Sequence, residues 1–172
     1  MNGSGFFCFF ILLAFVSIEF GFLEKAGEAG HSLALARQAG FEAESVSMAR
    51  SVLEESADAV VLDALKQGIA MDLEGEGIKW LVNERLSALF GGMESVYGQC
   101  PVVSFEEKGV SFLNGNSSVF VQRVGKKEVV AEYSFTGGLM RDRPLNARIS
   151  CGNAEAFFSL PAGYTMAATV VD

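Results

Sequence analysis

The pattern of hydrophobic and polar positions divides the chain into three parts, and the first part is almost entirely apolar. From Gly5 to Leu23, Glu19 is the one charged residue in the run. At about 1.5 Å per residue, a helix of this length reaches across a hydrocarbon core of roughly 30 Å. The pattern therefore predicts a transmembrane helix over residues 1–25.

A cleaved secretory signal and a buried core helix are the alternatives to an uncleaved anchor. A secretory signal has basic residues before a short apolar run and small residues at its cleavage site. Met1–Gly5 contains no Lys or Arg, and Glu24 and Glu28 surround the candidate cleavage positions. We therefore expect an uncleaved, single-pass anchor.

The middle part, residues 26–98, has a helical pattern without proline and forms the predicted stalk and packing helices. Apolar residues recur at every fourth position while acids fall on other faces, which predicts an amphipathic helix with one buried stripe. The stripe comprises Leu53, Ala57, Val61, Leu65, Ile69 and Leu73, widened by Val46, Ala49 and Val60. Each glycine inside a helix costs up to about 1 kcal/mol, so we expect bends or breaks at Gly27, Gly30 and above all Gly40.

A second helix is predicted over residues 78–97, after a flexible connector at residues 74–77 that contains two glycines. Its apolar residues recur at intervals of three and four, namely Ile78, Val82, Leu86, Leu89, Met93 and Val96. Trp80 lies near this stripe, and we expect it to be buried against the sheet.

The third part, residues 99–172, contains short β-branched and aromatic runs separated by Gly and Asn, a pattern that predicts strands. The candidate strands are 102–105, 110–113, 118–124, 128–135, 147–151, 156–160 and 164–171. The loop 125–127 predicts antiparallel pairing of 118–124 with 128–135, and residues 137–144 form a charged loop. Within 128–135, the apolar Val129, Ala131, Tyr133 and Phe135 alternate with polar residues, as in a strand with one wet face.

The expected fold class is therefore α+β. An N-terminal transmembrane helix continues into a long amphipathic helix, and a second helix and an antiparallel β-sheet domain follow.

Two cysteines in the last part are candidates for a disulfide. Cys151 is in phase with Ala147 and Ile149, so it should point inward, and Cys100 comes just before the first strand. A bridge would close most of the predicted sheet and contribute roughly 4 kcal/mol by the loop-entropy relation. Two buried free thiols are the alternative.

The sequence features that predict the orientation in the membrane disagree with one another. Lys25 is the only basic residue near either end of the apolar run, which slightly favours a cytoplasmic C-terminal side. Asn116, however, begins a glycosylation sequon with Ser117 and Ser118, and a disulfide needs an oxidising compartment. We expect the C-terminal domain to be extracytoplasmic.

Charge and residue content argue against several classes of chemistry. The net charge of −8 makes nucleic acid an improbable partner. No phosphate-binding glycine motif and no zinc-ligand spacing occur, and a catalytic triad would have to use His31, the one histidine, beside the anchor. Glu106, Glu107 and Glu132 are read as solvated acids, not as paired catalytic carboxylates. The loop residues Asn114, Asn116, Asp142 and Asn153 leave an oxygen-ligand calcium site open, but they lack EF-hand spacing. We predict no enzyme activity, catalytic residue, cofactor or metal site.

Glu19 lies about one turn from the end of the apolar run. An acid at the middle of a bilayer costs about 2.5–3.5 kcal/mol, so it tends to reach the interface or find a partner. Glu19 either extends to the interface or pairs with another copy of the chain within the membrane.

The order of these parts resembles type IV pilins, and the archaeal pilin-like proteins in particular. The resemblance rests on the apolar helix Phe6–Leu23, the amphipathic stripe Leu53–Leu73 and the strands after Pro101. It implies a structural or adhesive role at the cell surface, with membrane lipid and copies of the chain as partners and no cofactor. The alternative is a membrane-tethered extracytoplasmic domain that binds a ligand or protein as a sensor.

Overall fold

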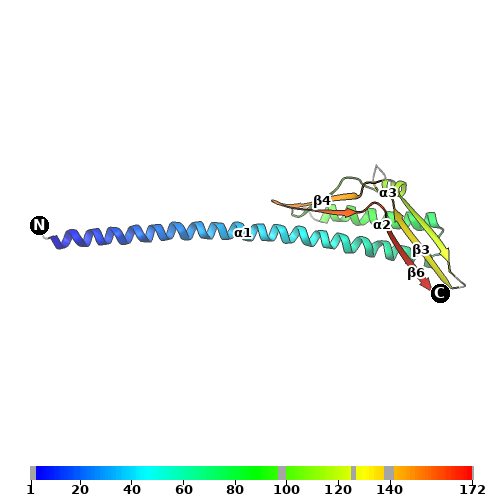
Figure 1. The fold of residues 1–172 in the computed structure, drawn as a ribbon, viewed down its shortest axis with the longest axis horizontal. Coiled ribbons are helices and arrows are strands. Elements are labelled where there is room, and N and C mark those ends of the chain that lie inside the picture. The colour runs from blue at the N-terminus through cyan, green and yellow to red at the C-terminus, as the bar shows by residue number, and fades with distance from the viewer. Residues whose placement is uncertain (1–2, 97–99, 125–126, 138–141, 172) are drawn as a thin grey trace. The chain divides into compact units, whose positions relative to one another are not determined.

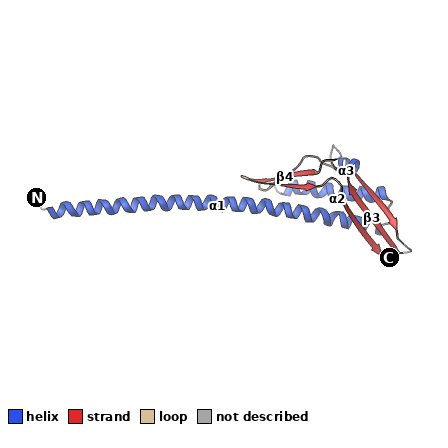
Figure 2. Ribbon diagram, viewed as in Figure 1, coloured by secondary structure: helices blue, strands red, loops and turns tan. Residues whose placement is uncertain are grey.

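The computed structural model describes residues 3–96, 100–124, 127–137 and 142–171, and within residues 1–24 it describes only the side chains of Ser17 and Glu19. The chain divides into two compact units, Met1–Phe41 and Glu42–Asp172, which we call the N-terminal and C-terminal units. Figure 1 gives the order of the elements, and Figure 2 distinguishes helices from strands.

Helix α1 (Gly3–Ala70) contributes all of the described part of the N-terminal unit. It continues through Gly27, Gly30 and Gly40, so the expected break at Gly40 is wrong. A glycine costs about 1 kcal/mol at such a position, which a neighbouring run of Ala, Leu and Glu residues offsets. From Lys25 to Phe41 every side chain is exposed, including those of Leu33, Leu35 and Phe41.

The described residues contain no helix that is both long enough and apolar enough to cross a bilayer. The predicted transmembrane segment, Gly5–Leu23, lies outside the described side chains apart from Ser17 and Glu19. Both of these side chains are exposed.

The predicted stripe of α1 is buried in the C-terminal unit. Val46, Ala49, Leu53, Val61 and Leu65 are at most 3% exposed. Each fully buried Val or Leu side chain contributes about 1.5–3 kcal/mol relative to exposure. Further along the ridge, Ile69 and Leu73 are partly buried against the same core.

Helix α2 (Gly75–Val96) begins earlier than expected, so most of the predicted connector at 74–77 is helical. The amide of Ile78 donates to the carbonyl of Glu74 at 3.0 Å, which starts the first turn. Gly75 allows close approach to β2, because a Cβ there would lie 3.1 Å from the carbonyl oxygen of Val119 and one of the two would have to shift by a few tenths of an ångström. Arg85 of α2 contacts Asp63 and Gln67 of α1, so the two helices are neighbours.

Most of the predicted inner face of α2 is confirmed, and one residue near it is misplaced. Ile78, Val82 and Leu86 are fully buried. Trp80 is 50% exposed, so the expected burial against the sheet is wrong. Two residues along a helix turn the side chain by about 200°, which points position 80 away from the face of Ile78. The predicted end of the helix at Tyr97 lies outside the described residues.

The strands form two antiparallel sheets of three strands instead of the single expected sheet. Sheet A has the order β1-β4-β5, from β1 (Val102–Phe105), β4 (Leu145–Cys151) and β5 (Ala154–Leu160). Sheet B has the order β2-β3-β6, from β2 (Ser117–Arg123), β3 (Glu128–Phe135) and β6 (Tyr164–Val171). The chain therefore passes from sheet A to sheet B, back to A, and again to B (Figure 2).

The predicted pairing of 118–124 with 128–135 is confirmed, with Val119 opposite Tyr133. The alternation in β3 is also confirmed, because Ala131, Tyr133 and Phe135 are fully buried. Residues 125–126 of the predicted hairpin loop and 138–141 of the predicted charged loop lie outside the described residues.

One predicted strand is a helix. Residues 110–113 belong to the short helix α3 (Val110–Asn116), although Val110 and Phe112 have high strand propensity. Leu113, which is 1% exposed, anchors α3 in the core, and Phe112 packs its ring edge against Phe135 at 6.4 Å. Tertiary packing thus outweighs local propensity in this segment.

The disulfide between Cys100 and Cys151 is confirmed, with a Cα–Cα distance of 4.8 Å. It joins the segment before β1 to the end of β4. The next turn, at Gly152 and Asn153, receives the carboxylate of Glu42 from α1, which accepts a hydrogen bond from the Asn153 amide at 3.0 Å. Gly152 has φ +56, and a Cβ there would overlap the Glu42 carboxylate. Glycine suits this turn because the backbone is left-handed, and a larger residue would have to displace the Glu42 carboxylate.

Candidate functional site

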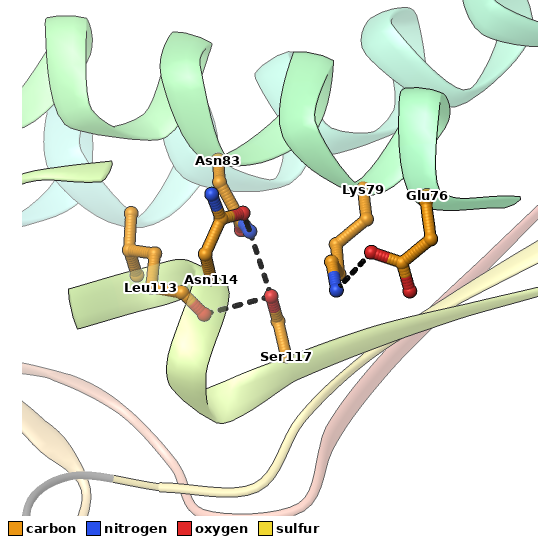
Figure 3. A network of polar contacts seen from close by, with 6 residues as sticks. All are labelled: Glu76, Lys79, Asn83, Leu113, Asn114 and Ser117. Atoms are coloured by element: carbon orange, nitrogen blue, oxygen red, sulfur yellow. Dashed lines mark hydrogen bonds and ion pairs between the residues drawn. The ribbon is translucent and has the colours of Figure 1, made fainter. Parts of the chain in front are cut away.

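A polar cluster lies inside the C-terminal unit, where α2, α3 and sheet B meet. Asn83 on α2 is fully buried, and its amide nitrogen donates to Asn114 Oδ1 and to Ser117 Oγ, each at 2.7 Å. The hydroxyl of Tyr133 donates to Asn83 Oδ1 at 2.9 Å. Figure 3 shows the approach of Asn83 to Asn114 and Ser117 from facing elements.

The hydrogen bonds of this cluster suit a structural clamp, which holds neighbouring elements together, better than a catalytic centre. Ser117 Oγ accepts from Asn83 and donates to the Leu113 carbonyl at 2.8 Å, so its proton is directed at a backbone oxygen instead of a base. A nucleophilic serine needs a neighbouring base that takes its proton. Among the described residues, no buried side-chain nitrogen or oxygen lacks a hydrogen-bond partner. The cluster therefore fixes α3 and β2 against α2.

Two tyrosines beside this cluster have perturbed acidity. Burial raises the pKa of Tyr133 above its ordinary value of 10.0 and outweighs the opposing effect of its hydrogen bond with Ser117. Burial also raises the pKa of Tyr164, whose hydroxyl donates to Asp58 at 2.8 Å, and the negative charge of Asp58 adds to the shift. The two rings pack edge to face at 6.4 Å. Both phenols thus stay protonated in the folded chain well beyond their usual range.

Two of the hollows lined by described residues lie on the surface of the C-terminal unit. The larger, of about 330 Å³, has an apolar floor and a charged rim; it is lined by Ile69, Asp72, Leu73, Glu74, Ile78, Val121, Arg123 and Val129. Arg123 and Asp72 pair across 2.8 Å, and both side chains are more than 70% exposed. These charges meet each other at the rim, so they do not converge on a ligand in the hollow.

The smaller hollow, of about 200 Å³, lies beside the stacked rings of Phe90 and Phe105. Glu94 at its edge accepts hydrogen bonds from the Phe105 amide at 3.0 Å and from Lys108 Nζ at 2.8 Å. Burial acts to raise the pKa of the Glu94 carboxyl, but these two hydrogen bonds and the Lys108 charge lower it below its ordinary value. The carboxylate therefore holds the loop after β1 against α2.

The residues singled out from the sequence fall at separate places. Cys100 and Cys151 are brought together, whereas Glu19 belongs to the N-terminal unit. Asn116 is the last residue of α3 and not part of a loop, and it is half-buried. Its side-chain amide nitrogen, the atom to which a glycan would be joined, donates to the Phe112 carbonyl at 2.9 Å.

The candidate catalytic and metal-binding residues do not form one constellation. His31 is exposed on α1 in the N-terminal unit. Glu132 lies on β3 of sheet B, whereas Glu106 and Glu107 follow β1 of sheet A. Within the described part of the chain, no group of three or more His, Cys, Asp or Glu side chains is placed to hold a metal ion. The proposed calcium ligands separate likewise, with Asn114 and Asn116 on α3 and Asn153 in the β4–β5 turn.

Comparison with known proteins gives no match to a family model, to a curated protein or to a solved structure.

The sequence patterns described above did not predict the burial of two polar residues, Glu42 and Asn83. A signal for each was present. Glu42 precedes Val46 and Ala49 at helical spacing, and Asn83 directly follows Val82 on the inner side of α2. A polar residue within an apolar stripe requires a partner when it is buried. What the sequence does not give is the identity of that partner.

Replacing Asn83 by leucine should destabilise the fold strongly, because Tyr133, Asn114 and Ser117 lose their shared partner. Each buried polar group left without a hydrogen bond costs about 1–3 kcal/mol. Urea unfolding followed by tryptophan fluorescence measures this loss. Ser95→Ala on the same helix removes an exposed local bond and should stay within about 0.5 kcal/mol of the wild type. Equal stability of Asn83→Leu and Ser95→Ala would contradict the role of the clamp.

The stability of the chain should fall as the pH rises above about 10. Because the folded pKa values of both tyrosines are raised, the unfolded chain loses phenolic protons first, and stability present below pH 10 is lost above it. Each tyrosine contributes up to about 1.4 kcal/mol per pH unit. The Tyr164→Phe variant should show a shallower decline in urea titrations between about pH 9 and 11. A slope identical to that of the wild type would exclude Tyr164 as a source.

Proposed function

We propose that this chain is a non-enzymatic, pilin-like surface protein, held in the membrane or assembled with its own copies through the N-terminal part of α1. The observation that carries the proposal is the exposure of every side chain from Lys25 to Phe41 on one continuous helix. Among these, Leu33, Leu35 and Phe41 are each more than 50% exposed. These exposed apolar side chains on one helix are available for contact with a partner.

The sequence before this segment indicates what kind of partner the segment contacts. The run Gly5–Leu23 is apolar enough to enter lipid, and the exposed segment follows it directly. Partners of the chain in this proposal are membrane lipid and further copies, and the acidic net charge argues against nucleic acid. No cofactor is needed.

The disulfide supports an extracytoplasmic location for the C-terminal unit. A bond between Cys100 and Cys151 persists in an oxidising, extracytoplasmic compartment and not in a reducing cytosol. Anchored at its N-terminus, the chain would display sheets A and B outside the cell. This arrangement suits structural or adhesive work at the surface.

The hollow beside β2 is the feature that would favour a tethered binding domain instead. Two of its three charged lining residues, Asp72 and Arg123, pair with each other, and the third is Glu74. A ligand site of this kind normally presents a few polar groups that converge on the bound molecule. For that reason we favour the structural role.

Membrane anchoring is tested on cells that express the full chain. Alkaline carbonate should leave the chain in the membrane pellet, and external protease should remove the C-terminal unit from intact cells. A matched control carries Ile11→Glu and Phe15→Glu, two acids at the middle of the apolar run, and should be extracted by alkali. Release of the unchanged chain by alkali, or protection of its C-terminal unit from external protease, would overturn the anchored, outward-facing model.

Glu19 separates a simple anchor from an assembled filament. If the acid pairs with a neighbouring copy, Glu19→Ala should remove filaments seen by electron microscopy of native membranes while the chain stays membrane-bound. Glu19→Gln retains hydrogen bonding and should have a milder effect. Filaments that persist unchanged in Glu19→Ala would show that Glu19 only reaches the interface.

A further inference from the structure

The outward face of sheet B carries one large aromatic side chain in a row of three cross-strand neighbours. Phe120 on the edge strand β2 lies opposite Glu132 on β3, and Glu132 lies opposite Ala167 on the other edge strand, β6. All three residues are exposed, and Phe120 is 66% exposed. This row, which we call row B, therefore presents a large apolar, an acidic and a small residue in that order.

The outward face of sheet A carries a row with the opposite order of properties. Ser104 on the edge strand β1 lies opposite Arg148 on β4, and Arg148 lies opposite Phe157 on the edge strand β5. Phe157 is 57% exposed, and the Arg148 side chain is 62% exposed. This row, which we call row A, presents a small, a basic and a large apolar residue.

The two rows match when they are laid face to face. Neighbouring strands are about 4.8 Å apart in any sheet, so the three positions have the same spacing in both rows. Phe120 then lies over Ser104, Glu132 over Arg148, and Phe157 over Ala167. Large residues meet small ones, and the two charges have opposite signs.

The surroundings of both rows leave this contact open. On sheet B, row B has two neighbouring rows on the same face, Ser118, Ser134 and Thr165 on one side and Gln122, Val130 and Thr169 on the other. On sheet A, Glu155 pairs with Arg148 through both carboxylate oxygens, by a hydrogen bond from Nη2 to Oε2 at 3.1 Å and an ion pair between Nε and Oε1, which orients the guanidinium. A guanidinium has five N–H donors, so Arg148 retains donors for a second carboxylate.

We propose that row B of one copy binds row A of the next copy. The occupant is a second copy because the chain itself carries the complement in size and in charge. Since both rows are exposed in one chain, each copy offers one row of each kind, and the contact is heterologous. A heterologous contact that does not close into a ring continues as an open chain of copies. The inference rests on the structural function proposed above and names the contact between C-terminal units within it.

Cysteine cross-linking tests this contact with the full chain in the membrane. Two tagged versions are co-expressed in a Cys8→Ser background, one with Ala167→Cys and one with Phe157→Cys, and a short bifunctional maleimide is added, because facing residues of stacked sheets are about 10 Å apart and a disulfide bridges Cα atoms only up to about 7 Å apart. These positions face each other, so we expect a cross-linked heterodimer and no homodimer of either variant. The matched control combines Ala167→Cys with Ser104→Cys, which are offset by about 10 Å along the rows in addition to the spacing between the sheets, and should not cross-link.

The outcomes that overturn the contact are specific. Homodimers of each variant would indicate a like-with-like interface, and cross-linking of the control pair would indicate rows stacked in the same order. Absence of any cross-link, with the chain still retained after alkaline extraction, would reject this contact and leave the anchored surface protein intact. Formation of the Cys100–Cys151 bond, checked by thiol labelling, shows that each variant has folded.

A charge change tests the central pair separately. Glu132→Lys places a cation against Arg148 and should reduce the cross-link yield at low salt by about tenfold or more. Glu128→Lys changes the same charge on the same face of β3 but outside row B, and it should leave the yield within about twofold of the unchanged chain. Equal yields for both variants would remove the charge pair from the contact.

Discussion

The burial of one stripe of α1 is the interaction on which the C-terminal unit depends. Leu53, Val61 and Leu65 have no exposed surface, and residues of α2 and of both sheets belong to the same core. Because an amphipathic helix gains most of its stability from such packing, and the sheets need a second layer to cover their apolar faces, neither is expected to be stable without the other. The other contacts of this unit therefore depend on the packing of this stripe of α1.

Polar contacts then fix how the elements meet. Glu42 binds the turn of sheet A at Asn153, the Asn83 cluster binds α3 and β2 to α2, and Tyr164 binds sheet B to α1 through Asp58. The Cys100–Cys151 bond joins the segment before β1 to the end of β4, 51 residues away in sequence, which limits the freedom of the unfolded chain. Such a bond persists in an oxidising, extracytoplasmic compartment.

The local features of this fold could be read from the sequence, whereas the long-range ones could not. Alternation in 128–135 predicted β3, and the inward phase of Cys151 predicted the disulfide, because both depend on a repeat of two residues. The separation into two sheets depends on which strands pair across the chain, such as β1 with β4, and no local pattern contains that information. Residues 110–113 became a helix because Leu113 fills a place in the core, which outweighs their strand propensity.

The same distinction applies to the candidate surfaces. Exposure of Phe120 and Phe157 follows from strand alternation, but their placement beside Glu132 and Arg148 requires the registers of both sheets. The buried partners of Glu42 and Asn83 likewise come from segments far away in the sequence. Sequence patterns thus predict which residues face outward from a sheet. The pairing of strands determines which charged and apolar residues lie side by side on that outward face.

Hydrogen exchange along α1 tests most directly whether the two parts of this helix pack against different partners, one within its own chain and one outside it. In the full chain dispersed as single copies in detergent, amides from Val46 to Leu65 should exchange slowly, at rates set by global unfolding. Amides from Lys25 to Phe41 should exchange rapidly in that state and become protected in native membranes, where copies are concentrated. Equally strong protection of residues 25–41 in dispersed and membrane-bound chains would contradict the account, because the segment would then need no partner outside its own chain.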